Sequence, residues 1–384
     1  MKDIYLDTAA TTRVDKSVLK EVMKFSETFY ANPSSQHSLG SSARKSIEVA
    51  RKKIADFIGA EAEEIIFTSG GTESNNFAIK GLALANPDKR HIITSVIEHP
   101  AVLESCQALG KLGYKVDYVG VNNEGIVDIK DIERKIRKDT LLVSIMHVNN
   151  EIGTIQPIAE IGKICKKNKV YFHTDAVQSF KKIKIDVNSM NIDLMSMSGH
   201  KINAPKGIGF LYVRLGTRIK PFMDGGGQEF KLRGGTENTM GIAGIAKALE
   251  IDDEEEKVHG VRDFMIAELM KIKKTRINGS LTNRIYNSIN VSFYGIEGES
   301  LMLMLNEEGI YVSTGSACAS SKLEESSVLK AINVDELYIH GSIRISMDKE
   351  IDMKDADFVI EKIKEKVEKL RSISPFKIGG DEDD

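Results

Sequence analysis

Short apolar runs alternate with amphipathic stretches from about residue 64 to residue 215. The runs are the length of buried strands and rich in β-branched residues, whereas the stretches between them have helical periodicity. The runs lie at 64–68, 91–94, 115–121, 141–148, 170–173, 194–198 and 207–213, and helical stretches begin near Thr72, Pro100, Asp128 and Pro157. This alternation predicts an α/β fold with a mostly parallel seven-stranded sheet between helices.

The pattern changes after residue 240. A helical stretch at 241–272 leads away from the alternating region, and residues 288–293 and 342–346 read as strands of a smaller α+β unit. We therefore predict a boundary near residue 260. The last residues, 377–384, end in four acidic residues and are predicted to form a flexible tail.

Composition excludes several classes of protein. The 53 basic and 56 acidic residues give a net charge of −3 and are scattered along the chain, so specific nucleic-acid binding is not expected. Neither an apolar signal core nor a run long enough to span a bilayer is present in the 384 residues, which favours a soluble, cytoplasmic protein. The three cysteines match neither a disulfide framework nor a zinc pattern, so no intrinsic metal site is expected.

Glycine and hydroxyl residues follow the first of these strands. Ser69-Gly70-Gly71-Thr72 opens a helix, where free backbone N–H groups and the helix dipole favour a phosphate. A Gly-Gly turn before a helix is also a common connector, so this signal is weak alone.

Two later strands end in residues suited to a cofactor. Asp175 stands at the carboxyl end of a central strand, where a buried carboxylate requires a cation such as a protonated pyridine nitrogen; a helix N-cap is the alternative. Lys201 follows Ser198 and His200 just past the next strand and is suitably placed to form a Schiff base. An isolated lysine is more often a solvated surface group.

Cys318 and Arg344 are candidates for substrate chemistry. Cys318 lies in a stretch of small residues, 313–321, which predicts an accessible loop and a nucleophilic thiol, whereas Cys106 and Cys165 lie in helical patterns typical of buried thiols. Arg344 lies in an alternating strand pattern, where an arginine taken alone more often forms a structural ion pair; its planar pair of donors would also suit a carboxylate ligand.

Together these segments resemble the NifS/IscS-type cysteine desulfurases, in the class V aminotransferase branch of fold-type I pyridoxal phosphate (PLP) enzymes. The resemblance runs in order from about residue 4 to 347. It rests on six segments: Asp7-Thr8-Ala9-Ala10-Thr11-Thr12, Thr68-Ser69-Gly70-Gly71-Thr72-Glu73-Ser74-Asn75, Glu98-His99, His147-Val148-Asn149-Asn150-Glu151-Ile152-Gly153, Asp175-Ala176-Val177-Gln178 and Ser198-Gly199-His200-Lys201. It implies a large domain over 15–260 and a small domain formed by 1–14 and 261–376.

The resemblance also implies a role for each matching residue. Lys201 would carry PLP, Asp175 would pair with the pyridine nitrogen, Gln178 would bind the phenolic oxygen and His99 would stack on the ring. The phosphate ligands would be Gly71, Thr72, Ser198, His200 and, from the neighbouring subunit, Thr236, which implies a homodimer with shared active sites. Arg344, assisted by Asn150, would bind the substrate carboxylate.

The implied reaction converts L-cysteine to L-alanine and leaves the sulfur on Cys318 as a persulfide, with Lys201 and His99 as acid–base groups. The expected acceptors are an iron–sulfur scaffold protein or a sulfur carrier, and Cys318 is a candidate ligand for a transferred cluster. A selenocysteine lyase or a small-amino-acid aminotransferase of the same fold is the alternative, and a non-enzymatic scaffold subunit is disfavoured because every expected site residue is present.

Overall fold

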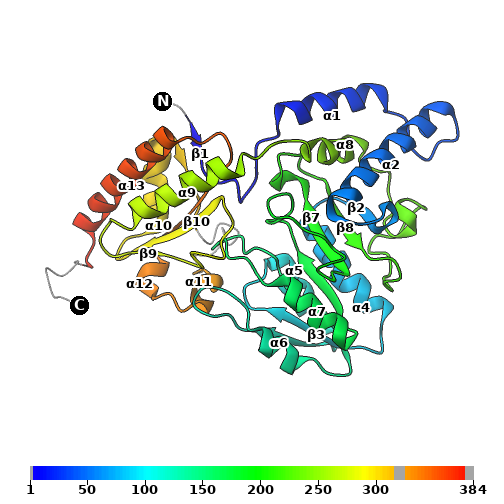
Figure 1. Cartoon of the computed structure of the whole chain (residues 1–384), viewed down its shortest axis with the longest axis horizontal. Helices are drawn as coiled ribbons and strands as arrows, with labels where there is room; N and C mark the ends of the chain where they lie inside the picture. Colours follow the sequence, from blue (N-terminus) through cyan, green and yellow to red (C-terminus); the bar gives the residue numbers. More distant parts are fainter. Residues whose placement is uncertain (1–2, 315–324, 377–384) are drawn as a thin grey trace.

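A seven-stranded sheet forms the centre of the larger half of the molecule (Figure 1). The structure, a computed structural model, describes residues 3–314 and 325–376. The strand order is β2-β8-β7-β6-β5-β3-β4, and only β8 runs antiparallel to its neighbours. The strands are β2 Ile65–Thr68, β3 His91–Ser95, β4 Lys115–Val119, β5 Thr140–Ser144, β6 Tyr171–Asp175, β7 Leu194–Ser198 and β8 Gly209–Val213. The predicted mostly parallel sheet is therefore confirmed.

Helices cover both faces of this sheet, and each face has its own apolar core. Alternate residues of one strand enter different cores: Phe210 and Tyr212 of β8 pack on one face, and Leu211 on the other. This is why the strands read as continuous apolar runs. The helices of this half are α1 Lys16–Thr28, α2 Ser38–Ile58, α3 Gly71–Asn76, α4 Leu82–Ala85, α5 Pro100–Lys111, α6 Ile129–Lys135, α7 Ile158–Asn168 and α8 Thr239–Ala248.

The smaller half is built on a three-stranded sheet, ordered β12-β10-β9, and a parallel pair, β1 with β11. Its separate core includes Ile4 and Leu6 from the N-terminus together with Val359 and Ile363 from α13. The strands are β1 Ile4–Tyr5, β9 Thr275–Ile277, β10 Ser288–Phe293, β11 Ile310–Tyr311 and β12 Ser342–Ser346. The helices are α9 Glu255–Leu269, α10 Gly298–Glu307, α11 Ser327–Ala331, α12 Glu336–Ile339 and α13 Met353–Ile373.

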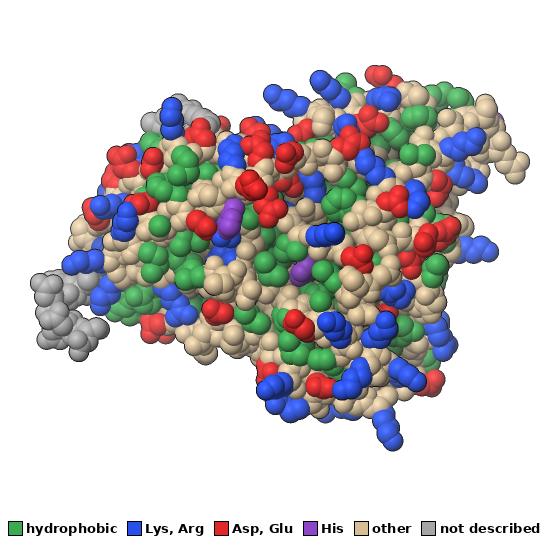
Figure 2. Space-filling model, in the orientation of Figure 1, with side chains coloured by type: hydrophobic (Ala, Val, Ile, Leu, Met, Phe, Trp, Pro, Cys, Tyr) green, Lys and Arg blue, Asp and Glu red, His purple; other side chains and the backbone are tan. Residues whose placement is uncertain are grey.

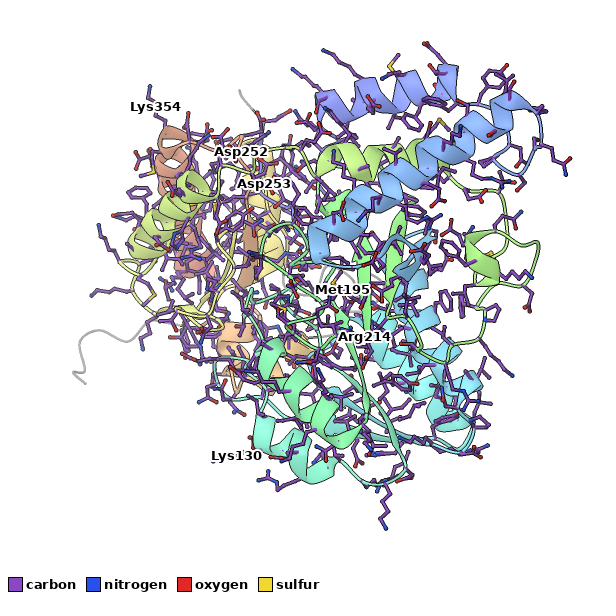
Figure 3. All side chains as sticks on the ribbon, turned by 45° about the vertical axis from the view of Figure 1, so that its right-hand side comes forward. Lys130, Met195, Arg214, Asp252, Asp253 and Lys354 are labelled. Atoms are coloured by element: carbon purple, nitrogen blue, oxygen red, sulfur yellow. The ribbon has the colours of Figure 1, made fainter. Side chains whose placement is uncertain are left out.

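The helical stretch expected at 241–272 is not one helix. Two helices, α8 and α9, occupy it, with a break between Ala248 and Glu255. The chain turns between them at Asp252, whose carboxylate accepts a hydrogen bond from the backbone N–H of Glu254 at 2.9 Å, and Glu254 has a φ of 49°. The next acidic residue, Asp253, pairs with Lys181 at 2.5 Å. Figure 3 labels Asp252 and Asp253 on this crossing between the two halves, with Met195 inside the large sheet.

Figure 2 shows basic and acidic side chains intermixed over the face that it draws. Among the described residues, no helix combines the length and the apolar character that a bilayer crossing requires.

Candidate active site

A cavity of about 290 Å³ opens where the carboxyl ends of the central strands meet the N-terminal segment and strand β12. In open α/β sheets this edge is the usual place for a ligand. The cavity is lined by Ala9, Ala10, Gly71, Thr72, Asn75, His99, Met146, Asn150, Asp175, Val177, Gln178, Ser198, His200, Lys201 and Arg344. Of the predicted cofactor and substrate residues that the structure describes, it therefore brings together all except Thr236.

The turn from β2 into α3 provides one end of the cavity. Helical backbone continues from Gly71 through a π-type turn to Ala85, so the N–H groups at its start face the cavity side of the sheet. A β-carbon at Gly71 would lie 2.7 Å from Cγ2 of Val177, and one at Gly209 would lie 2.7 Å from Cα of Gly70. Both glycines are required for this close approach.

Asp175 lies at the end of β6 and is only 5% exposed. Its carboxylate accepts hydrogen bonds from Nδ2 of Asn75 at 2.7 Å and from the backbone N–H of Val177 at 2.9 Å. The contact with Val177 resembles the N-cap alternative, but Asp175 also faces the cavity. A buried carboxylate in this position favours a cationic ligand.

Lys201 ends a single 3₁₀ turn, Gly199–Lys201, that follows β7. Its Nζ donates hydrogen bonds to the backbone oxygens of Ala9 and Ala10 at 2.5 and 2.7 Å, and Nε2 of Gln178 donates to the same Ala9 oxygen at 2.9 Å. The amine is therefore held inside the cavity by the N-terminal segment, which excludes the reading of a solvated surface lysine.

His99 caps α5 from the cavity wall. Its Nδ1 accepts a hydrogen bond from the backbone N–H of Ala101 at 3.1 Å, which leaves Nε2 to carry the proton of the neutral ring. Burial lowers the pKa of His99, and the charge of Lys201 lowers it further, against the opposing effect of Asp175. A neutral imidazole can both stack on a flat ring and donate a hydrogen bond from Nε2.

Arg344 closes the far end of the cavity from β12. Its Nη2 donates to Oδ1 of Asp7 at 2.7 Å, and its Nη1 donates to the backbone oxygen of Asn150 at 3.1 Å. Its Nε is buried and has no hydrogen-bond partner among the described residues. The guanidinium therefore has donor capacity for a carboxylate ligand, although its contact with Asp7 also matches the ion-pair alternative.

Two predicted residues are not among those that line the cavity, for different reasons. Thr236 is exposed and does not line the cavity of its own chain. Its segment is attached to α3 by Arg233, which pairs with the buried Glu73 at 3.0 Å. Cys318 lies outside the described residues. The other two cysteines, Cys106 and Cys165, are fully buried, and burial raises the pKa of the Cys106 thiol to about 12.

Several residues of the site were not assigned from sequence. Asn75 binds Asp175, Asp7 pairs with Arg344, and Oγ1 of Thr11 lies 3.1 Å from Nδ1 of His200. All three belong to segments that carried the family resemblance, but none has a charge or spacing that indicates a partner a hundred or more residues away. Only the fold reveals these pairs.

A buried acid supports the wall behind His99. Oε1 of Glu98 accepts hydrogen bonds from the Ser95 hydroxyl at 2.6 Å and from the backbone N–H of Met146 at 3.0 Å. Its Oε2 is buried with no partner among the described residues, and burial raises the pKa of the Glu98 carboxyl to about 8. Glu98 is therefore protonated at neutral pH.

Comparison with known proteins identifies the family. The chain matches the family model described as aminotransferase class-V over residues 4–359. The chain belongs to this family. Among its relatives, cysteine desulfurase IscS of Methanosarcina thermophila is 51% identical over 381 residues, which are 98% of this chain and 94% of that protein. Cysteine desulfurase IscS of Dictyoglomus turgidum is 50% identical over 383 residues, covering 98% of this chain and 97% of that protein.

Two solved structures are similar to this fold. A NifS-like protein superposes with a TM-score of 0.90 at 40% identity, covering 96% of this chain and all of that one. SspA in complex with cysteine superposes with a TM-score of 0.82 at 40% identity, covering 90% of this chain and 98% of that one. These likenesses confirm the resemblance to NifS/IscS-type cysteine desulfurases and the predicted fold class.

Proposed function

We propose that this chain is a PLP-dependent cysteine desulfurase that converts L-cysteine to L-alanine and keeps the sulfur as a persulfide on Cys318. The observation that supports it most is the single cavity in which Lys201, Asp175 and Arg344 come together from three different parts of the chain. The relatives named cysteine desulfurase, and the likeness to SspA in complex with cysteine, support the same substrate.

The residues present suit PLP, on which class V aminotransferases depend. In this proposal Gly71, Thr72, Ser198 and His200 hold the phosphate, His99 lies against the ring, and Asp175 and Gln178 bind the ring nitrogen and phenolic oxygen. Bound to Lys201, PLP supplies an electron sink for the Cα carbanion of an amino acid. The buried carboxylate of Asp175 maintains the charge on the ring nitrogen that this role requires.

The remaining residues of the cavity orient the amino acid. Arg344 binds the substrate carboxylate in a bidentate geometry, and Asn150 fixes the guanidinium through its backbone oxygen. Nζ of Lys201 moves the Cα proton, and the Nε2–H of His99 donates a hydrogen bond to the substrate sulfur. Because the pKa of His99 is lowered, its ring is neutral at neutral pH and keeps the Nε2 proton for this contact.

Sulfur transfer balances without an external oxidant. The Cys318 thiolate attacks the substrate sulfur, a new S–S bond forms and the substrate C–S bond breaks. The electron pair of the broken bond stays with the substrate carbon, which takes up a proton to give L-alanine, and the enzyme keeps the one sulfur atom. The thiols of Cys106 and Cys165 are unsuitable for this step because both are fully buried.

The proposal includes a homodimer in which Thr236 completes the phosphate site of the neighbouring subunit. Its exposure and its absence from the cavity of its own chain support this role. The persulfide then passes to a second protein, either an iron–sulfur scaffold or a sulfur carrier. The name IscS of the relatives favours supply to iron–sulfur cluster assembly.

The proposal is tested with wild type and Cys318→Ala, incubated with PLP, L-cysteine and a reductant, by measuring alanine and sulfide. We expect equal amounts of both products from the wild type and neither from Cys318→Ala, which should retain the yellow colour of the bound cofactor. If the variant keeps full activity, Cys318 is not the sulfur acceptor. If the wild type leaves cysteine unchanged but acts on another amino acid, the proposed activity is wrong.

A further inference from the structure

Residues 315–324, here called the Cys318 segment, are flanked by Ser313 and Ser326. Ser313 contacts the strand that carries Arg344, and Ser326 contacts Glu151 in the turn beside it. On the N-terminal side, the backbone N–H of Ser313 donates to the oxygen of Arg344 at 3.1 Å, and the N–H of Arg344 donates to the oxygen of Ser313 at 2.6 Å. The N-terminal boundary of the segment is therefore bonded to the arginine that is proposed to bind the substrate carboxylate.

On the C-terminal side, the contact is made by side chains. The hydroxyl of Ser326 donates to Oε2 of Glu151 at 2.5 Å, and its oxygen accepts from the backbone N–H of Leu329 at 3.1 Å as the N-cap of α11. Helix α11 is held in place by Val328 and Leu329, which pack in a small apolar cluster with Ile97, Met146 and Ile152 of the large half. Ser326 is thus a fixed point, and Glu151 is its only side-chain partner among the described residues.

Glu151 in turn belongs to the surroundings of Arg344. It follows Asn150, whose backbone oxygen accepts from the guanidinium, and its own backbone oxygen accepts from Nδ2 of Asn290 at 3.2 Å. Asn290 is the direct partner of Arg344 across the β10–β12 ladder. Burial raises the pKa of the Glu151 carboxyl to about 7, while the hydrogen bond from Ser326 and the charge of Arg344 act in the opposite direction.

We infer that Glu151 is a positioning residue of the sulfur-transfer step, which acts through Ser326 on the segment that carries Cys318 and through the Asn150 turn on Arg344. The inference rests on the proposed function. The same hydrogen bonds would then position both the substrate, through its carboxylate, and the thiol that attacks the substrate sulfur. A displacement reaction requires this alignment of the two reacting sulfur atoms. The expected consequence is a defect in turnover that is larger than any defect in substrate binding.

Substitutions at Ser326 separate this role from simple helix capping. Ser326→Thr keeps both contacts, Ser326→Ala loses both, and Ser326→Asp keeps an N-cap side chain but places a second carboxylate against Glu151. We expect Ser326→Thr to stay within about twofold of wild type, and both other variants to lower kcat for alanine formation by roughly 10-fold with a smaller change in KM. Ser327→Ala, at the adjacent exposed serine, is the matched control and should match wild type.

Substitutions at Glu151 provide the second arm. Glu151→Gln retains an acceptor for Ser326 and should preserve more of kcat than Glu151→Ala, with Glu160→Gln on α7 as the control. Exchange of the Cα proton of L-alanine with D₂O uses Lys201 and Arg344 but transfers no sulfur, so this exchange should remain near the wild-type rate in the Ser326 variants.

The outcomes distinguish the proposed desulfurase activity from the proposed positioning role of Glu151. If the wild type forms alanine from L-cysteine but Ser326→Ala and Glu151→Ala match it, the proposed function stands and the positioning role is wrong. If Ser326→Asp has the kcat of wild type while Ser326→Ala does not, Ser326 acts only as a helix cap and the inference is also wrong. If the wild type forms no alanine at all, the proposed function fails and this inference fails with it.

Discussion

The two ends of the cavity are built in different ways. The cofactor end comes from the strand ends of one sheet, where the pairing of Asp175 with Ser196 fixes the distance between β6 and β7. The substrate end depends on Arg344, whose partners Asp7 and Asn150 come from segments 337 and 194 residues away in the chain. A hydrogen-bonded ladder fixes positions rigidly, whereas side-chain pairs between distant segments can exchange partners when a ligand arrives. We therefore expect the cofactor end to be preformed and the substrate end to be adjustable.

The largest effect should come from the residue that joins the two ends, Lys201. Lys201→Ala removes both the attachment point of PLP and the proposed base, so kcat should fall by more than about 10⁴-fold. Alanine formation at saturating L-cysteine and PLP measures this loss. The exposed neighbour Lys206 supplies the control, and Lys206→Ala should remain active. Substantial activity in Lys201→Ala would remove the basis of the assignment.

Asp175 tests whether the cofactor end depends on charge as well as shape. Asp175→Asn keeps an oxygen acceptor for Asn75 and Val177 but loses the buried negative charge, so we expect kcat/KM to fall by roughly 10³-fold while PLP still binds. Steady-state kinetics and the cofactor spectrum report the two quantities separately. Asp357→Asn, on the exposed side of α13, should have no effect. A mild effect at Asp175 would favour its role as a helix cap alone.

Glu98, behind the cofactor end, tests whether a buried carboxyl is protonated in the folded protein and makes the free energy of unfolding depend on pH. Its folded-state pKa of about 8 lies above the ordinary value of 4.5, so the folded state binds the proton more tightly than the unfolded state. The free energy of unfolding should therefore fall as pH rises from about 4.5 through 8, by about 5 kcal/mol in total and by about 3 kcal/mol between pH 5.5 and pH 9. Urea unfolding of wild type and Glu98→Gln at pH 5.5 and pH 9 measures the difference. If both proteins show the same pH dependence, Glu98 ionises normally.

The smallest effect should appear at the adjustable end. Arg344→Lys keeps the positive charge but loses the planar pair of donors, so KM for L-cysteine should rise by roughly 10-fold with a smaller change in kcat. Arg276→Lys on β9 is the matched control. An unchanged KM would mean that Arg344 is only the ion-pair partner of Asp7.

The contrast between strand ends and pairs of distant side chains also explains which parts of the site could be predicted from the sequence. The strand ends at Asp175 and Lys201 were predictable because the apolar runs locate the strands and parallel strands bring their carboxyl ends to one edge. The pairs Asp7–Arg344 and Asn75–Asp175 were not, because a polar side chain carries no record of which distant segment will face it. The break between α8 and α9 was missed because acidic residues such as Asp252 continue a polar helical face while also bonding the backbone of Glu254. The domain boundary near residue 260, the individual site roles and the dimer remain predictions.

The most direct test of the central claim is mass spectrometry of the protein after a single turnover with L-cysteine in the absence of reductant. We expect the peptide that contains Cys318 to gain one sulfur atom in step with alanine formation, whereas the peptides that contain the buried Cys106 and Cys165 stay unchanged. Alanine formation without added sulfur on Cys318, or with sulfur on another cysteine, would contradict it.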